Sequence, residues 1–156
     1  MTSFLQVYIH AVWSTKYRQP ILTRDQRPIL LDHITTNARS KGIYIDTIGG
    51  YIDHVHCLFR LGKEQTIAKT IQLIKGESAY WANKQKLIKP SLRWQEEYYA
   101  GSVDYKSIQS VRNYIINQEQ HHAVKTFDEE YNKLTIIHGI DGAKAPGDVG
   151  RFIARS

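Results

Sequence analysis

The sequence is poor in the features that mark secreted and membrane proteins. It contains one cysteine, Cys57, so the chain cannot form an internal disulfide. No window approaches the ~20 consecutive apolar residues of a transmembrane helix, and the first residues lack the basic and apolar regions of a secretory signal. Internal repeats and low-complexity blocks are also missing. We therefore expect a cytoplasmic protein that works in a reducing compartment and has no membrane partner.

Length and composition are those of one ordinary globular domain. With 156 residues, of which 42% are hydrophobic and 23% charged, the chain can bury a core without a structural metal. We place this domain at residues 1–140. Residues 141–156, rich in glycine, alanine and proline, are expected to form a flexible tail without a catalytic role. The formal net charge of +6 suits a polyanionic partner, although many basic proteins bind none.

Two histidines lie in a strand-like segment that runs from Asp53 to Leu61. Alternate residues of a strand point to the same side, so His54 and His56 share a face with Leu58 and Arg60. The opposite face is apolar and is expected to be buried, with Cys57 as an inert thiol. Imidazoles are the commonest metal ligands in proteins, and two of them on a rigid strand can hold part of a coordination sphere. The same spacing also fits two polar positions on a half-exposed strand.

The hydrophobic pattern predicts four strands and three long helices. The strands are expected at residues 7–13, 43–48, 53–61 and 92–100, and Gly49 and Gly50 are expected to turn the second strand into the third. The first helix follows a capping box at Thr23, the second follows Thr66, and the third runs from about Tyr105 to about His122. A short helix at 128–134 and a strand at 134–137 complete the prediction.

This order of elements predicts an α+β fold, a ferredoxin-like sandwich of the kind also found in RNA-recognition domains. Its four-stranded antiparallel sheet has the first and third strands in the centre, which agrees with the two most apolar strands of this chain. The two crossover helices cover one face of the sheet. The face that carries His54 and His56 is left for the C-terminal helix.

Tyr114 and Gln118 are four residues apart on that helix, so both side chains project from one face. If the helix lies over the open face, the Gln118 amide oxygen can join His54 and His56 at a metal ion, and Tyr114 can reach a phosphate bound to it. Neutral ligands leave the ion its full charge as a Lewis acid. A tyrosine nucleophile would form a 5′-phosphotyrosine and retain the bond energy needed to rejoin strands. Alternatively, Tyr114 is a buried aromatic with a satisfied hydroxyl and Gln118 a surface amide.

Further histidines and cations are weaker candidates. Lys16 and Arg18 flank Tyr17, a pattern that suits single-stranded nucleic acid because cations contact phosphates and a ring contacts a base. His10 is expected to make a structural hydrogen bond. His121 and His122 are placed either at the metal or at the helix C-terminus, where the helix dipole favours them. The candidate phosphate contacts, each of which is also compatible with a solvated charge, are Lys16, Arg18, Arg60, Lys69 and Lys75.

The pair of motifs His54-Val55-His56 and Tyr114-Ile115-Ile116-Asn117-Gln118 resembles the HUH endonuclease superfamily. Within it, the chain is similar to the single-tyrosine transposases of small bacterial insertion sequences, which are related to the transposases associated with repeated extragenic palindromes. Supporting segments are residues 12–18, 74–76 and 118–122, and the resemblance covers residues 5–135.

The resemblance implies a catalytic domain that cleaves and rejoins single-stranded DNA at hairpin ends and uses Mg²⁺ or Mn²⁺. It assigns His54, His56 and Gln118 as metal ligands and Tyr114 as the nucleophile. It also implies a homodimer, with exchanged tyrosine helices in some members, for which residues 101–104 would serve as the hinge.

Two other functions remain open from the residues alone. The same sheet topology serves non-catalytic RNA-recognition modules, which require exposed aromatics on the first and third strands. A metallohydrolase could instead use His54, His56 and a bound water molecule.

Overall fold

The computed structural model describes residues 3–122, and the predictions for residues 123–156 lie outside the described residues. These are the helix at 128–134, the strand at 134–137 and the tail at 141–156. Within residues 3–122, no helix combines the length and the apolar character needed to cross a bilayer.

One antiparallel sheet of four strands organises the chain. It is formed by β1 (Tyr8–Ser14), β2 (Tyr44–Gly50), β3 (His54–Arg60) and β4 (Tyr99–Val103), in the order β2-β3-β1-β4. The predicted α+β fold is therefore confirmed, with the first and third strands in the centre. In the register of the central pair, His10 lies opposite Leu58 and Val12 lies opposite His56.

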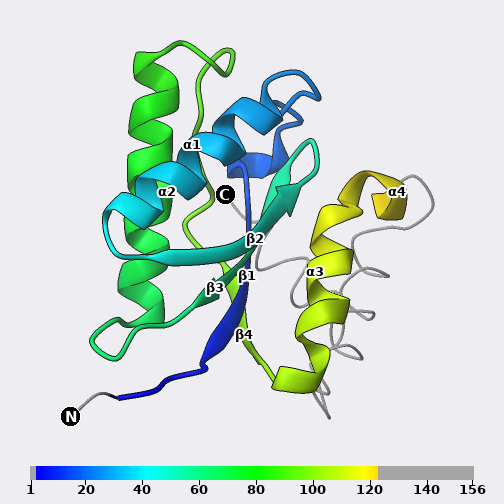
Figure 1. The fold of residues 1–156 in the computed structure, drawn as a ribbon. Coiled ribbons are helices and arrows are strands. Elements are labelled where there is room, and N and C mark those ends of the chain that lie inside the picture. The colour runs from blue at the N-terminus through cyan, green and yellow to red at the C-terminus, as the bar shows by residue number, and fades with distance from the viewer. Residues whose placement is uncertain (1–2, 123–156) are drawn as a thin grey trace.

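Helices cover both faces of the sheet (Figure 1). The long helices α1 (Arg27–Ser40) and α2 (Ile67–Lys84) lie on one face, over the larger core that contains Trp13, Val55 and Phe59. On the other face lie α3 (Ile108–Ile116) and the short α4 (Gln118–His122). The smaller core beneath α3 consists of Leu58, Val103, Ile108, Val111 and Ile115. The alternation of β3 thus sends Leu58 and the two histidines to α3, as the sequence predicts.

The residues predicted to begin and end helices do so at the start of α2 and at the end of α1. Thr66 caps α2, because its hydroxyl accepts a hydrogen bond from the Lys69 amide at 3.1 Å. At the end of α1, Gly42 takes a left-handed φ of +78°, which a glycine adopts without steric cost. Thr23 accepts a hydrogen bond from the Gln26 amide at 3.4 Å, but regular α-helix begins only at Arg27.

Three boundary predictions are wrong. The last strand is Tyr99–Val103, whereas most of residues 92–98 form a loop whose apolar side chains join the core. Gly101 is therefore a strand residue paired with His10, and residues 101–103 belong to β4 rather than to a break in the chain. The hinge role of residues 101–104 stays a prediction. The predicted third helix is divided into a short 3₁₀ turn (Tyr105–Ser107), α3 and α4, with Asn117 between the last two.

The predicted turn at Gly49 and Gly50 is also wrong. Both residues belong to β2 and pair with His56 and Val55, and the turn lies at residues 51–53. A Cβ atom at Gly49 would lie 2.3 Å from the Ile115 carbonyl oxygen of α3. The glycine is therefore required by the close approach of the tyrosine-bearing helix to the sheet.

Candidate active site

Two imidazoles form the floor of a buried polar cluster. His54 and His56 leave the same face of β3, both are completely buried, and their ring centroids are 5.1 Å apart. Strand geometry fixes this spacing, because residues two apart on a strand have parallel side-chain directions. The sequence-based placement of the pair beneath the C-terminal helix is what the structure shows.

α3 and α4 complete the cluster from above. The centroid of the Tyr114 ring lies 5.6 Å from that of His56. The Gln118 amide nitrogen donates to the Tyr114 carbonyl oxygen at 3.2 Å, which leaves its Oε1 facing His54 Nε2, also at 3.2 Å. Although Asn117 interrupts the helix, Tyr114 and Gln118 stay together. One chain thus brings all four predicted residues into a single site.

The outer nitrogen of each imidazole is also engaged. His54 Nδ1 lies 2.7 Å from a carboxylate oxygen of Asp53, and His56 Nδ1 lies 2.9 Å from Nε2 of His10. The hydrogen bond predicted for His10 is therefore present. When His54 donates its Nδ1 proton to Asp53 and His56 donates its own to His10, each ring retains an Nε2 lone pair inside the site.

Asp53 is held in its charged form. Burial by itself would raise the pKa of Asp53, but the pKa lies below its ordinary value, and the hydrogen bond from His54 together with the charge and hydrogen bond of Arg18 acts in this direction. An ionised Asp53 accepts a hydrogen bond from Nδ1–H of His54, which fixes the tautomer and the direction of the ring.

The donor set fits a divalent cation. With Nδ1–H of His54 donated to Asp53, the Nε2 lone pair of His54 and the Oε1 lone pairs of Gln118 point at each other across 3.2 Å. Two adjacent ligands on one metal ion are separated by about this distance, because metal–ligand bonds of ~2.1 Å meet at roughly a right angle. Within residues 3–122, no three His, Cys, Asp or Glu side chains are arranged so that they could hold a metal ion by themselves, so an ion here would depend on the Gln118 amide.

A bidentate ion pair fastens α3 to its own sheet. Arg112 donates from Nε and Nη2 to the two carboxylate oxygens of Asp46, at 2.8 and 2.7 Å. Asp46 lies at an irregularity in the register of β2, between Ile45 and Thr47. The hydrogen bond from Arg112 is the largest cause that lowers the pKa of Asp46, and it outweighs the opposing effect of burial. Tyr114 follows Arg112 by two residues, so this pair ties the helix segment that carries Tyr114 to β2.

α4 has an anchor of its own. Glu119 accepts from the buried guanidinium of Arg27 at the start of α1 and lies 3.5 Å from Arg24. Arg27 also donates to the Leu22 carbonyl oxygen at 2.8 Å, which fixes the guanidinium in place. Since Glu119 is adjacent to Gln118, this ion pair holds the amide over His54.

A sequence profile of the family described as IS200-like transposases matches residues 3–118. The chain belongs to this family. The match contains all four residues of the site, from His54 to Gln118, and spans most of the chain.

Other comparisons agree with this family. The ISDra2 transposase TnpA of Deinococcus radiodurans is 29% identical over 119 residues, which cover 72% of this chain and 84% of that protein. A solved structure of a candidate transposase from the same organism has a TM-score of 0.56 at 24% identity, covering 76% of this chain and 95% of that one. A REP-associated tyrosine transposase, solved bound to a REP hairpin, has a TM-score of 0.58 at 15% identity, covering 78% and 72%. At these identities the two structures support the fold.

In this IS200-like transposase the five predicted phosphate contacts lie in different places. Arg18 lies next to the site but is paired with Asp53 at 3.0 Å, and Lys16 lies beside it in the same loop. Arg60 is exposed at the far end of β3 and contacts the ring of Tyr44. Lys69 and Lys75 lie on α2, on the opposite face of the sheet. The Lys75 ammonium donates to the carbonyl oxygens of residues 95 and 96.

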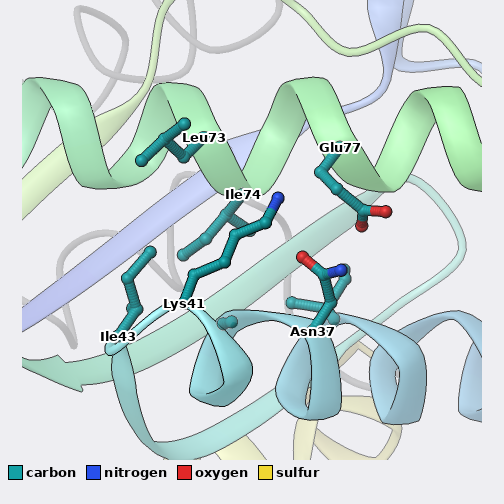
Figure 2. A pocket seen from close by; sticks show the side chains of 8 residues that line it. Asn37, Lys41, Ile43, Leu73, Ile74 and Glu77 are labelled. Atoms are coloured by element: carbon teal, nitrogen blue, oxygen red, sulfur yellow. The ribbon is translucent and has the colours of Figure 1, made fainter.

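Two of the pockets that border α2 are separate from the histidines. One lies between α1 and α2, where Asn37, Lys41 and Glu77 extend toward each other (Figure 2). Its volume of about 10 Å³ is close to that of a single water site. A groove of about 580 Å³ lies between α2 and residues 94–98. Both lie on the face of the sheet that α1 and α2 cover, so neither is part of the polar cluster.

Several supporting side chains, including the pair Arg27 and Glu119, are not predicted from the sequence. Asp46 and Arg112 are 66 residues apart and carry no local signal of their pairing. Asp53 did carry a signal, because a carboxylate next to a candidate metal-ligating histidine is a common partner for the distal ring nitrogen. The side chains of His121 and His122 lie outside the described part of the chain, so the alternatives for them remain as stated.

Removing the Arg112 side chain should destabilise the fold, because it takes away the ion-pair partner of the Asp46 carboxylate. We expect Arg112→Ala to lower the free energy of unfolding by about 1 kcal/mol at pH 7, a value kept small because Arg112 is partly exposed to solvent. Because the pKa of Asp46 is lowered in the folded state, this contribution is present above the ordinary carboxyl pKa. It disappears as the pH falls through the lowered value.

Denaturant unfolding at pH 7 and at pH 3 measures this effect. The difference between wild type and Arg112→Ala should shrink at the lower pH, and exposed Lys106→Ala serves as the control. An equal difference at both pH values would contradict an electrostatic role for the pair.

Proposed function

We propose that this transposase cleaves and rejoins single-stranded DNA through a covalent bond between Tyr114 and a 5′-phosphate. The observation that carries the proposal is the convergence of the Tyr114 ring and the Gln118 amide upon His54 and His56 within one chain. Family membership supports a DNA-processing activity. The relative bound to a REP hairpin supports a substrate with hairpin ends.

The reaction exchanges one phosphodiester for another. The Tyr114 phenol loses its proton, its oxygen bonds to phosphorus, and the bond from phosphorus to the 3′-oxygen breaks. The 3′-oxygen takes up one proton and leaves as a 3′-hydroxyl, so the proton lost by the phenol is balanced. Attack by a 3′-hydroxyl on the phosphotyrosine reverses these changes and rejoins a strand without ATP. The number of phosphoester bonds stays constant, which distinguishes a transferase from a nuclease that activates water.

His54, His56 and Gln118 would hold Mg²⁺ or Mn²⁺, which when bound supplies a Lewis acid for the phosphodiester and favours the tyrosine anion. The protein's own contribution is orientation. Asp53 and His10 fix the two rings, and the Tyr114 carbonyl fixes the amide. The Tyr114 side chain is 3% exposed, so a substrate phosphate reaches it only when α3 or α4 shifts.

The structure disfavours the non-catalytic RNA-recognition module. Such modules stack bases on exposed aromatics of the two central strands. Here the corresponding face carries His10, Leu58 and the histidine pair, all fully buried beneath α3 and α4. The sheet face is therefore closed to a base in this state.

The test is incubation of the protein with single-stranded hairpin DNA and Mg²⁺, followed by denaturing electrophoresis. A protein–DNA adduct that survives denaturation supports the transferase. Cleavage without an adduct would support a water-using metallohydrolase, and binding without cleavage would support a binding module.

The predicted homodimer stays a prediction. α3 packs on β2 and β3 of its own chain, and one chain supplies all four residues of the site. Assembly of the site therefore does not require exchange of the tyrosine helix.

Gln118→Ala should separate metal dependence from DNA affinity. Removal of the amide oxygen is expected to raise the Mg²⁺ concentration needed for half-maximal cleavage by about tenfold or more. Affinity for single-stranded DNA without metal should stay within about twofold. Exposed Gln120→Ala is the matched control. Equal loss of metal response and DNA affinity would count against Gln118 as a ligand.

A further inference from the structure

The loop after β1 has an unusual backbone. In the 3₁₀ turn Lys16–Arg18, Tyr17 has φ and ψ of +59° and +16°, and Arg18 has a φ of +52°. These are left-handed conformations that glycine adopts readily and that a bulky side chain disfavours. Two such residues in succession persist only where the surrounding structure enforces them.

Several anchors enforce this conformation. The Thr15 hydroxyl donates to the Gln19 carbonyl oxygen at 2.7 Å, and the Lys16 amide donates to the Arg93 carbonyl oxygen at 2.8 Å. The Arg18 guanidinium donates to Asp53 at 3.1 Å. The loop is thus tied to the core on both sides of Tyr17.

The strained residue gains little from packing. The Tyr17 side chain is 59% exposed, and the Lys16 ammonium lies 5.8 Å from the centre of its ring. A bulky aromatic in a left-handed conformation and directed to solvent adds little to the core. Backbone strain at a residue that makes few stabilising packing contacts is typical of ligand-binding loops.

The loop is also joined to the candidate active site. Arg18, the next residue after Tyr17, binds the same Asp53 carboxylate that holds His54. The ring of Tyr17 is therefore carried by a segment whose position is fixed relative to the histidine pair.

We propose that Tyr17 is a stacking platform for an unpaired base of the DNA strand and that Lys16 contacts the adjacent phosphate. The proposal rests on the proposed function and adds a binding site for a nucleobase to it. Arg18, which the sequence analysis placed among the phosphate contacts, instead positions the platform. Stacking on a tyrosine face is tolerant of sequence because every base has a π-face.

Binding of a fluorescent single-stranded oligo(dT) tests the platform. Measured by anisotropy in the Tyr114→Phe background, Tyr17→Ala should weaken binding roughly tenfold or more, whereas Tyr17→Phe should stay within about twofold. Tyr80→Ala is the matched control, because Tyr80 is 68% exposed and lies 5.9 Å from Lys84 but sits on α2, on the opposite face. An oligo carrying 2-aminopurine should lose fluorescence on binding only when an aromatic occupies position 17.

Tyr17→Gly distinguishes recognition from a structural role. Glycine relieves the left-handed strain, so this variant should keep or raise the melting temperature while it loses as much affinity as Tyr17→Ala. The proposal is overturned if both variants bind oligo(dT) within twofold of the parent, or if Tyr80→Ala loses as much. Adduct formation by Tyr114 is scored separately, so weakened binding without any adduct would retain the platform and reject the transferase.

Discussion

Tyr114→Phe should abolish the covalent protein–DNA adduct and reduce strand cleavage at least about a thousandfold, because it removes the proposed nucleophile. The phenylalanine keeps the ring that packs beside His56, so the fold and the affinity for single-stranded DNA should change little. Because the tyrosine is proposed to bond to the 5′-phosphate, labels at the two ends of the DNA should behave differently. The adduct should carry a label placed at the 3′ end of the DNA, and a label at the 5′ end should appear on a free fragment with a 3′-hydroxyl.

Neighbouring tyrosines provide the control for this result. Tyr8→Phe changes a half-buried ring on the same face of the sheet, next to the core beneath α3, and should leave the adduct intact. The ring of Tyr51 lies 6.3 Å from that of His54, so it is the alternative nucleophile to examine. An adduct that persists in Tyr114→Phe and maps to Tyr51 by peptide mass spectrometry would contradict the assignment of Tyr114.

The parts of the site that the sequence predicted are those that depend on local geometry. The period of a strand places His54 and His56 together, and the period of a helix places Tyr114 near Gln118. Tyr114 and Gln118 stay close in spite of the break at Asn117, because α4 begins directly at Gln118. The order of strands and helices then dictates that the two pairs meet, since two crossover helices already occupy the other face.

What could not be predicted depends on contacts between distant segments. The partner of Arg112 is a carboxylate at an irregular position of β2, and Glu119 is fixed by an arginine from α1. The apolar residues near Trp94 predict a strand because their pattern indicates only burial, which buried loops share with strands. The pair Gly49-Gly50 predicts a turn, whereas the structure requires glycine at position 49 because Ile115 of α3, 66 residues further along the chain, approaches its backbone closely.

Loss of either imidazole should remove the response of the protein to metal. A ligand that binds only the folded state raises its stability by about 2.7 kcal/mol at one hundred times the dissociation constant, so Mn²⁺ should raise the melting temperature of the wild type. His54→Asn and His56→Asn should lose both this shift and cleavage, while each keeps a polar group beneath α3. Because the ligating nitrogens must be deprotonated, the shift should also diminish as the pH is lowered.

His33→Asn is the matched control for these variants. This histidine pairs with Glu77 at 2.8 Å on the opposite face of the sheet, so its loss should leave the Mn²⁺ shift unchanged. Chelation should stop cleavage by the wild type without releasing bound DNA, since the proposed contacts to the strand are made by cations and rings rather than by the metal. Full cleavage after chelation would mean that the imidazole pair orients the substrate directly, and an Mn²⁺ shift that survives in His56→Asn would mean that the ion binds without His56. If cleavage needs no metal, Tyr114 needs another cation to favour its charged form. Arg18 would be the first to test, because it is paired with Asp53, which in turn binds His54.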